Sequence, residues 1–265
     1  MAKDAKSAFC EDSRVKFPTL MHLMGMGFKY VSLKGLKTKY VEAPKTEFDP
    51  LTNILTDFFT DAYCTLNPKA EKKDAEDMLV KIQKSLQNDD LGRQFYNEIL
   101  LNTGERIIDL SSPANFYRNN TFQVTTEMSC GSKDSDNYRP DITIFVNGLP
   151  LAFIEVKKEN NHKGIQAETD RMKQRFVNPQ YRRFLNITQI MVFSNDMEYD
   201  NNEVTPTIGA FYATIGKKNT KYNCFREEGQ DSFPTARHIH QVTPEEEEVL
   251  LRDNNVPQYK NSSEY

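Results

Sequence analysis

The sequence predicts an α/β (α+β) fold in which a mixed β-sheet is flanked by helices. Before residue 102, three segments have apolar residues at helical spacing, whereas from residue 120 onward the pattern alternates with a period of two. One helical segment, 162–176, lies between two of the later strands. This order of elements is typical of a mixed sheet with a helix packed on it.

The helices of the first half are predicted from their ends and their apolar faces. The first, 14–26, has Gly25 and Gly27 around its end and leads into a strand at Phe28–Leu33. The other two, 73–87 and 89–101, start with acidic residues, which complement the helix dipole. The residues expected on their buried faces are Met78, Leu79, Ile82, Leu86, Leu91, Phe95, Ile99 and Leu100.

The second half of the chain supplies most of the strands. The helix 162–176 between them would turn an apolar stripe towards the sheet, and a short acidic helix would follow Thr243-Pro244. The stripe consists of Ile165, Thr169, Met172 and Phe176. The strand candidates are 121–128, 141–146, 149–157, 187–194 and 207–215.

Composition limits the classes of function. The 265-residue chain has a net charge of −4 at pH 7, so nucleic-acid binding would need a local basic patch or a partner. Apolar runs are too short for a membrane span, the N-terminus lacks a secretion signal, and the four cysteines are scattered. These features favour a cytoplasmic protein without a membrane contact. We expect one unit over 1–242, and an acidic helix with a connector over 243–265.

The most informative stretch is Pro140–Lys158. Two apolar strands flank an Asn-Gly pair, which is the strongest short signal for a β-hairpin. The charges lie at the open end of this hairpin, with Asp141 on one strand and Glu155 and Lys157 on the other. Because residues two apart in a strand share a face, Glu155 and Lys157 point the same way.

The length of the turn decides whether Asp141 joins them. A two-residue turn would place Asp141 and Glu155 on opposite faces. A three-residue loop, Val146–Gly148, would put Asp141 opposite Phe153 and on the same face as Glu155. We predict the three-residue loop, because a glycine suits the positive φ of its last position.

Two carboxylates and an ammonium group at the end of a buried hairpin are costly to desolvate unless they serve one another or a metal. Asp141 and Glu155 provide hard oxygen ligands that suit Mg²⁺, and the backbone carbonyl of Val156 can provide a third. Lys157 can then orient or deprotonate a water molecule that attacks a phosphodiester. The competing interpretation is that these charges are ordinary solvated strand ends.

These residues resemble the nuclease region of the R (restriction) subunit of type I restriction–modification enzymes, which has a PD-(D/E)xK restriction-endonuclease-like core. The hairpin carries the specific part of the resemblance, and segments on both sides of it add support. The matching segments are Arg139-Pro140-Asp141, Val146–Leu151, Ile154–Lys157, Asn119–Val124, Gln189–Asn195, Leu23-x-x-x-Gly27-Phe28-x-Tyr30, the helix at 74–86 and the tail near Pro257-Gln258-Tyr259.

The resemblance implies that Asp141 and Glu155 bind the catalytic metal and that Lys157 is the catalytic lysine. The implied function is Mg²⁺-dependent hydrolysis of double-stranded DNA, in a complex with modification and specificity subunits. ATP would be used by motor domains outside this chain, and 243–265 would lead towards them.

Two features of the family pattern are missing. Many members carry an acid in the first helix, and Lys16, Phe17 and Pro18 occupy that neighbourhood in this chain. Many also carry Gln-x-x-x-Tyr in the helix after the catalytic strand, and no such spacing occurs between residues 160 and 185. Arg171, Lys173 and Arg175 lie near that place, and they are either phosphate contacts or a solvated helix face.

Two alternatives stay open. One is a catalytically degenerate nuclease fold that docks partners, which the missing Gln-x-x-x-Tyr favours and the presence of all three active-site residue types opposes. The other is a nuclease of a different helicase-linked DNA-processing system. Motor-domain motifs in the sequence after Tyr265 would favour restriction over that second alternative.

Overall fold

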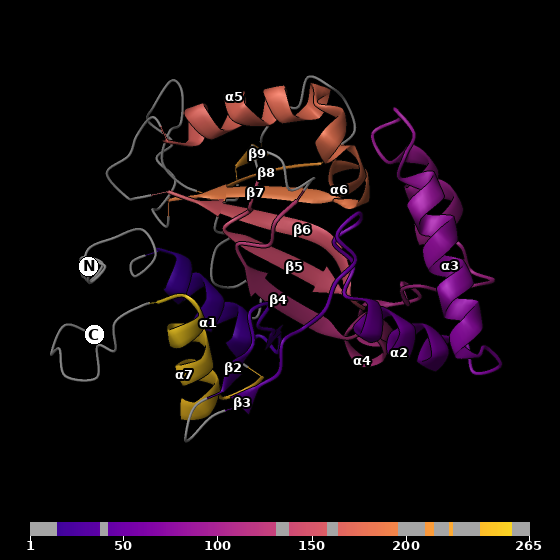
Figure 1. Ribbon diagram of the computed structural model, residues 1–265, viewed down its shortest axis with the longest axis horizontal. Helices are drawn as coiled ribbons and strands as arrows, with labels where there is room; N and C mark the ends of the chain where they lie inside the picture. The colour runs from indigo at the N-terminus through magenta and orange to yellow at the C-terminus, as the bar shows by residue number, and fades with distance from the viewer. Residues whose placement is uncertain are drawn as a thin grey trace, which may run out of the picture.

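The computed structural model describes residues 15–37, 42–130, 138–157, 164–195, 210–214, 223–224 and 239–255 (Figure 1). Among these residues, a seven-stranded sheet forms the centre of the fold, and a two-stranded hairpin of β2 (Leu36–Lys37) and β3 (Glu42–Ala43) lies apart from it. The large sheet contains, in spatial order, β1 (Lys29–Tyr30), β4 (Phe122–Thr126), β5 (Ile142–Val146), β6 (Leu149–Val156), β7 (Ile190–Ser194), β8 (Ala210–Thr214) and β9 (Asn223–Cys224).

The sheet is mixed, as the sequence predicts. β1 pairs with β4 and β6 pairs with β7 in parallel, while the other neighbours are antiparallel. The helices are α1 (Phe17–Gly25), α2 (Thr56–Leu66), α3 (Lys72–Ser85), the π-helical η2 (Phe95–Leu100), α4 (Pro113–Asn119), α5 (Gly164–Val177), the 3₁₀ turn η3 (Pro179–Tyr181), α6 (Arg182–Ile187) and α7 (Pro244–Asp253).

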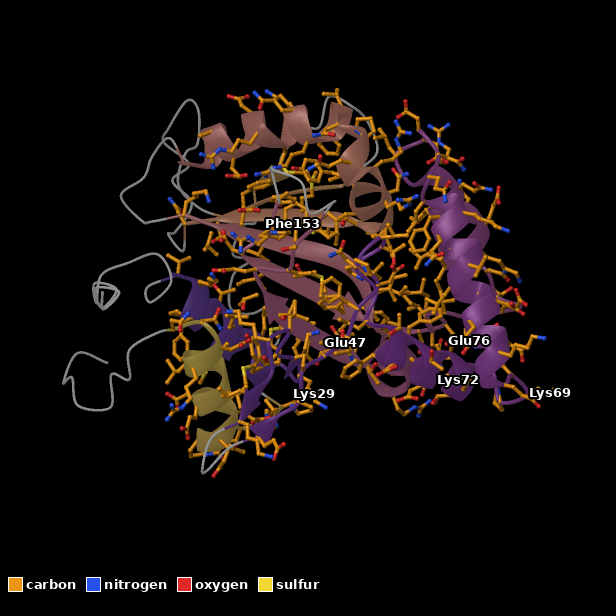
Figure 2. The ribbon with its side chains drawn as sticks, viewed as in Figure 1. Lys29, Glu47, Lys69, Lys72, Glu76 and Phe153 are labelled. Atoms are coloured by element: carbon orange, nitrogen blue, oxygen red, sulfur yellow. The ribbon has the colours of Figure 1, made fainter. Side chains whose placement is uncertain are left out.

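Helices cover both faces of the sheet and one of its ends (Figure 1). On one face, Phe153 of β6 packs with Met172 of α5 and Phe184 of α6, and Figure 2 shows Phe153 on the side of the sheet that faces α5. On the other face, Val156 packs in a cluster with α1 and with Leu250 of α7. α2 and α3 bury their apolar sides against the turn end of β5 and β6.

Most predicted elements are present, and the differences have local causes. The helix expected at 89–101 starts late, because Leu91 has a positive φ of 55° and is half-buried. The segment 187–194 is divided between the end of α6 and β7, and neither α2 nor α4 was predicted. α7 starts as expected, with a capping box between Thr243 and Glu246.

Some expectations are left without a test. The connector beyond residue 255 and the side chain of Ile165 lie outside the described residues. The division between 1–242 and 243–265 stays a prediction. No helix within the described parts of the chain combines the length and apolarity that crossing a membrane requires.

Candidate functional site

The turn of the β5–β6 hairpin has two residues. Val146 pairs with Leu149, and the residues between them, Asn147 and Gly148, have φ values of 53° and 76°. Positive φ at both central residues is typical of a type I′ turn, whose twist matches that of the strands. The predicted three-residue loop is therefore wrong, and this turn alone would separate the two carboxylates.

A β-bulge in β6 brings the carboxylates back to one face. Leu151 is an extra residue in β6. The two strands pair in one register on its turn side, and in a register shifted by one residue on its other side. The preceding Pro150 has no N–H to donate, and strands accommodate proline mainly at such irregularities. If the register continues for one residue beyond the last paired residues, Asp141 lies directly across from Glu155. They share a face as predicted, although they are opposite rather than diagonal.

The ammonium group of Lys157 lies at the centre of this end of the hairpin. Its Nζ donates to the carbonyl oxygen of Val156 at 2.8 Å, and it lies 4.0 Å from Asp141 Oδ2 and 3.8 Å from Glu155 Oε2. Asp141 Oδ2 also accepts a hydrogen bond from the backbone N–H of Val156, at 2.9 Å. The structure thus brings the three charged residues together, and one cation faces the three oxygens that the sequence singled out.

Glu155 is the more deeply buried of the two hairpin carboxylates, with 5% of its surface exposed. Tyr138 donates its hydroxyl to Glu155 Oε1 at 2.7 Å, while Oε2 faces Lys157. Burial, reinforced by the negative charges of Asp141 and Glu168, raises the pKa of Glu155 to about 8. A divalent cation at this place would oppose the shift, because it favours the ionised carboxylate.

A further carboxylate comes from α5. Glu168 is 1% exposed, and its Oε2 lies 3.7 Å from Lys157 Nζ. Arg171 binds Oε2 at 2.9 Å and Arg175 binds Oε1 at 2.7 Å, so both oxygens of Glu168 have a guanidinium partner. Arg175 also lies over the ring of Tyr138, 3.7 Å from its centroid, and so connects Glu168 to the residue that holds Glu155.

Sequence reasoning missed Glu168. The apolar stripe predicted for α5 correctly includes Met172, which is fully buried, but the stripe did not single out the acid beside it. One signal was available: arginines follow Glu168 at three and seven residues, and the i,i+3 spacing brings side chains together on a helix.

The three basic residues considered as phosphate contacts have different surroundings. Arg171 is 60% exposed at its side chain even though it binds Glu168. Lys173 pairs with Asp170 at the surface, at 2.9 Å. Arg175 is 19% exposed and is held by Glu168 and the tyrosine ring. Contact with DNA stays a prediction for all three, and Arg171 has a more accessible side chain than Arg175.

Comparison with known proteins gives a consistent assignment. A family model described as the type I restriction enzyme R protein N terminus matches residues 9–204. The chain belongs to this family. Among its relatives are the endonuclease subunits of type I restriction enzymes from Staphylococcus aureus strains COL and MW2, each 30% identical over 108 residues. These matches cover 39% of this chain and 11% of each relative, so the chain spans a small part of their length.

The residue before α1 is a buried lysine. Lys16, whose side chain is 3% exposed, forms an ion pair with Glu127 Oε1 at 2.8 Å. The backbone N–H of Glu127 donates to the carbonyl oxygen of Asp141 at 3.3 Å, so this pair lies beside the strand that carries the site. The additional carboxylate next to Lys157 comes from α5.

A restriction endonuclease family implies a divalent metal, and the hairpin offers a small set of oxygens that could bind one. Across the described residues, no group of three or more His, Cys, Asp and Glu side chains is arranged to hold a metal ion. The donors at the hairpin are instead two carboxylates and one backbone carbonyl, which already face a cation. Mg²⁺ keeps several waters and commonly takes one or two carboxylates, so this small set of hard oxygens fits it.

Proposed function

We propose that this chain is the DNA-cleaving part of a type I restriction enzyme R subunit, and that it hydrolyses phosphodiester bonds of double-stranded DNA with Mg²⁺. The observation that carries the proposal is the convergence of Asp141, Glu155 and Lys157 at one end of a hairpin, in a chain that belongs to this family.

Each residue at the hairpin has a role that follows from its position. Asp141, Glu155 and the carbonyl of Val156 would hold Mg²⁺, which when bound stabilises negative charge on the phosphate and lowers the pKa of water. The backbone N–H of Val156 and the hydroxyl of Tyr138 fix the two carboxylates. The amine of Lys157 is close enough to both of them to orient the attacking water or to take its proton.

The substrate and partners follow from the family and the charge. Double-stranded DNA would be presented by modification and specificity subunits and by ATP-driven motor domains of the same R subunit. A net charge of −4 agrees with this division of labour, because an acidic chain without a strong global positive field binds DNA weakly by itself. The family match favours restriction over a different helicase-linked system.

Cleavage of circular duplex DNA by the assembled restriction enzyme tests the proposal. Asp141→Ala and Lys157→Ala should abolish cutting and leave ATP hydrolysis at the wild-type rate. Glu76→Ala and Lys72→Ala on α3, which Figure 2 shows far from the sheet, are matched controls that should cut normally. If both site variants still cut, the assignment is wrong. If the wild-type enzyme itself never cuts while it hydrolyses ATP, a docking module is the better interpretation.

A further inference from the structure

The ammonium group of Lys157 has more than one carboxylate close to it. Three carboxylates, from Asp141, Glu155 and Glu168, lie within 4.0 Å of Lys157 Nζ. The first two belong to the hairpin and are the proposed metal ligands. Glu168 belongs to α5, and Arg171 and Arg175 bind its two oxygens.

Lys157 and a divalent cation would compete for the same oxygens. The ammonium donates to the carbonyl of Val156 and faces Asp141 Oδ2 and Glu155 Oε2. These are the atoms that would have to turn to Mg²⁺. The side chain of Lys157 is only 14% exposed, and an unpaired ammonium with so little access to water is costly, so Lys157 needs another anionic partner when the metal is present.

We propose that Glu168 is a positioning residue, which keeps the Lys157 ammonium beside the site when a divalent cation takes over the hairpin oxygens. The inference rests on the proposed function and extends it to a residue on α5. It would make Mg²⁺ binding depend on the geometry of α5.

Three observations support Glu168 in this role. Its Oε2 lies 3.7 Å from Lys157 Nζ, which is no further than the corresponding oxygens of the hairpin carboxylates. It is 1% exposed, so water would be a poor substitute for it as a partner of the ammonium. The two arginines fix its carboxylate, so that Lys157 can change partners with little rearrangement of Glu168.

Calorimetric titration of the chain with Mg²⁺ alone tests the inference through a double-mutant cycle. Lys157→Met should bind Mg²⁺ more tightly than wild type, because the competing cation is gone. Glu168→Gln should weaken binding by about tenfold when Lys157 is present, and by less than about twofold in the Lys157→Met background. Glu76→Gln on α3 is the matched control and should bind as wild type does.

Two results would overturn the inference. An equal loss of affinity in both backgrounds would show that Glu168 acts on the metal directly, and no loss in either would show that it has no part in binding. Glu168→Asp separates positioning from packing. It keeps the charge but not the length, so it should bind Mg²⁺ better than Glu168→Gln, whereas a packing role requires the reverse order.

If the proposed function itself is wrong, the Mg²⁺ titrations should give a different pattern of affinities. If wild type does not bind Mg²⁺, or if Asp141→Asn binds it as tightly as wild type, the metal site itself is wrong and the inference falls with it. If Asp141→Asn abolishes binding and the cycle shows no dependence on Lys157, the role of Glu168 alone is refuted.

Discussion

The two ends of the β5–β6 hairpin differ in how their buried polar groups are paired. At the turn, Asn147 is fully buried and each polar atom of its side chain has a partner. At the open end, Glu155 is almost as deeply buried but lies close to Lys157, which is also near the carboxylates of Asp141 and Glu168.

The turn is a closed network. Asn147 accepts from the backbone N–H of Thr121 and donates to the carbonyl of Ile107 and to Asn120 Oδ1. Gly148 donates its N–H to Gln123 Oε1. Since burying an unpaired polar group costs about 1–3 kcal/mol, complete pairing stabilises this end.

Among the described residues, the open end has no such closed network, and burial beside other carboxylates raises the pKa of Glu155. Buried carboxylates with a raised pKa are found where they serve binding or catalysis. The turn of the hairpin therefore contributes to stability, whereas its open end is suited to binding a ligand. Substitutions at the turn should lower stability, while a substitution at the site can raise stability and still abolish function.

The largest effect is expected for Gly148→Ala at the turn. Gly148 has a φ of 76°, and a Cβ there would lie 2.5 Å from the carbonyl oxygen of Leu55 and 2.9 Å from the backbone nitrogen of Phe59. Left-handed backbone and a clash with main chain together predict a loss of about 3 kcal/mol in the free energy of unfolding. Gly104→Ala, whose Cβ would meet a side-chain oxygen at 3.4 Å, should change it by less than about 0.5 kcal/mol in the same urea titration.

Glu155→Gln should shift stability in the opposite direction. A raised pKa means that the folded state holds this proton more tightly than the unfolded state. The wild-type free energy of unfolding therefore falls as pH rises from about 4.5 to about 8, and the variant lacks this decline. Metal-free urea unfolding should give similar midpoints at about pH 4 and a more stable variant at about pH 9. A variant that is less stable than wild type at the higher pH would show that the buried charge is not the cost we infer.

A smaller, pH-dependent loss is expected for Asp109→Asn, next to the turn network. Ser111 and Asn119 donate hydrogen bonds to the Asp109 carboxylate and lower its pKa to about 2. A lowered pKa adds stability above its unfolded value of 3.8, and this contribution is lost as pH falls towards 2. The variant should therefore have a lower Tm than wild type near neutral pH, and the gap should narrow in acid. A gap that is independent of pH would contradict this assignment.

The hairpin also shows how far sequence reasoning reaches. Its two strands and the residues at its open end follow from alternation, the Asn-Gly turn and strand parity. The register could not be predicted in the same way. The bulge at Leu151 shifts the pairing by one residue, whereas the prediction assumed strands that pair without interruption. Pro150 was the available signal, since a proline within a central strand indicates an irregularity.

Glu168 and Tyr138 could not be placed from sequence, because their roles depend on how α5 and the segment before β5 pack over the sheet. Local periodicity indicates which face of a helix is apolar, but it does not indicate that one acid on its margin is buried against two arginines. Lys16 is a similar case, because its ion pair with Glu127 joins residues 111 positions apart.

The most direct test of the central claim is the position of a bound metal. Mn²⁺ prefers oxygen ligands as Mg²⁺ does, and its anomalous scattering identifies it in crystals of this chain. We expect the strongest anomalous peak between Asp141, Glu155 and the carbonyl oxygen of Val156, with Lys157 turned towards Glu168. A peak elsewhere, with Lys157 still bound to the Val156 carbonyl, would contradict the proposed site.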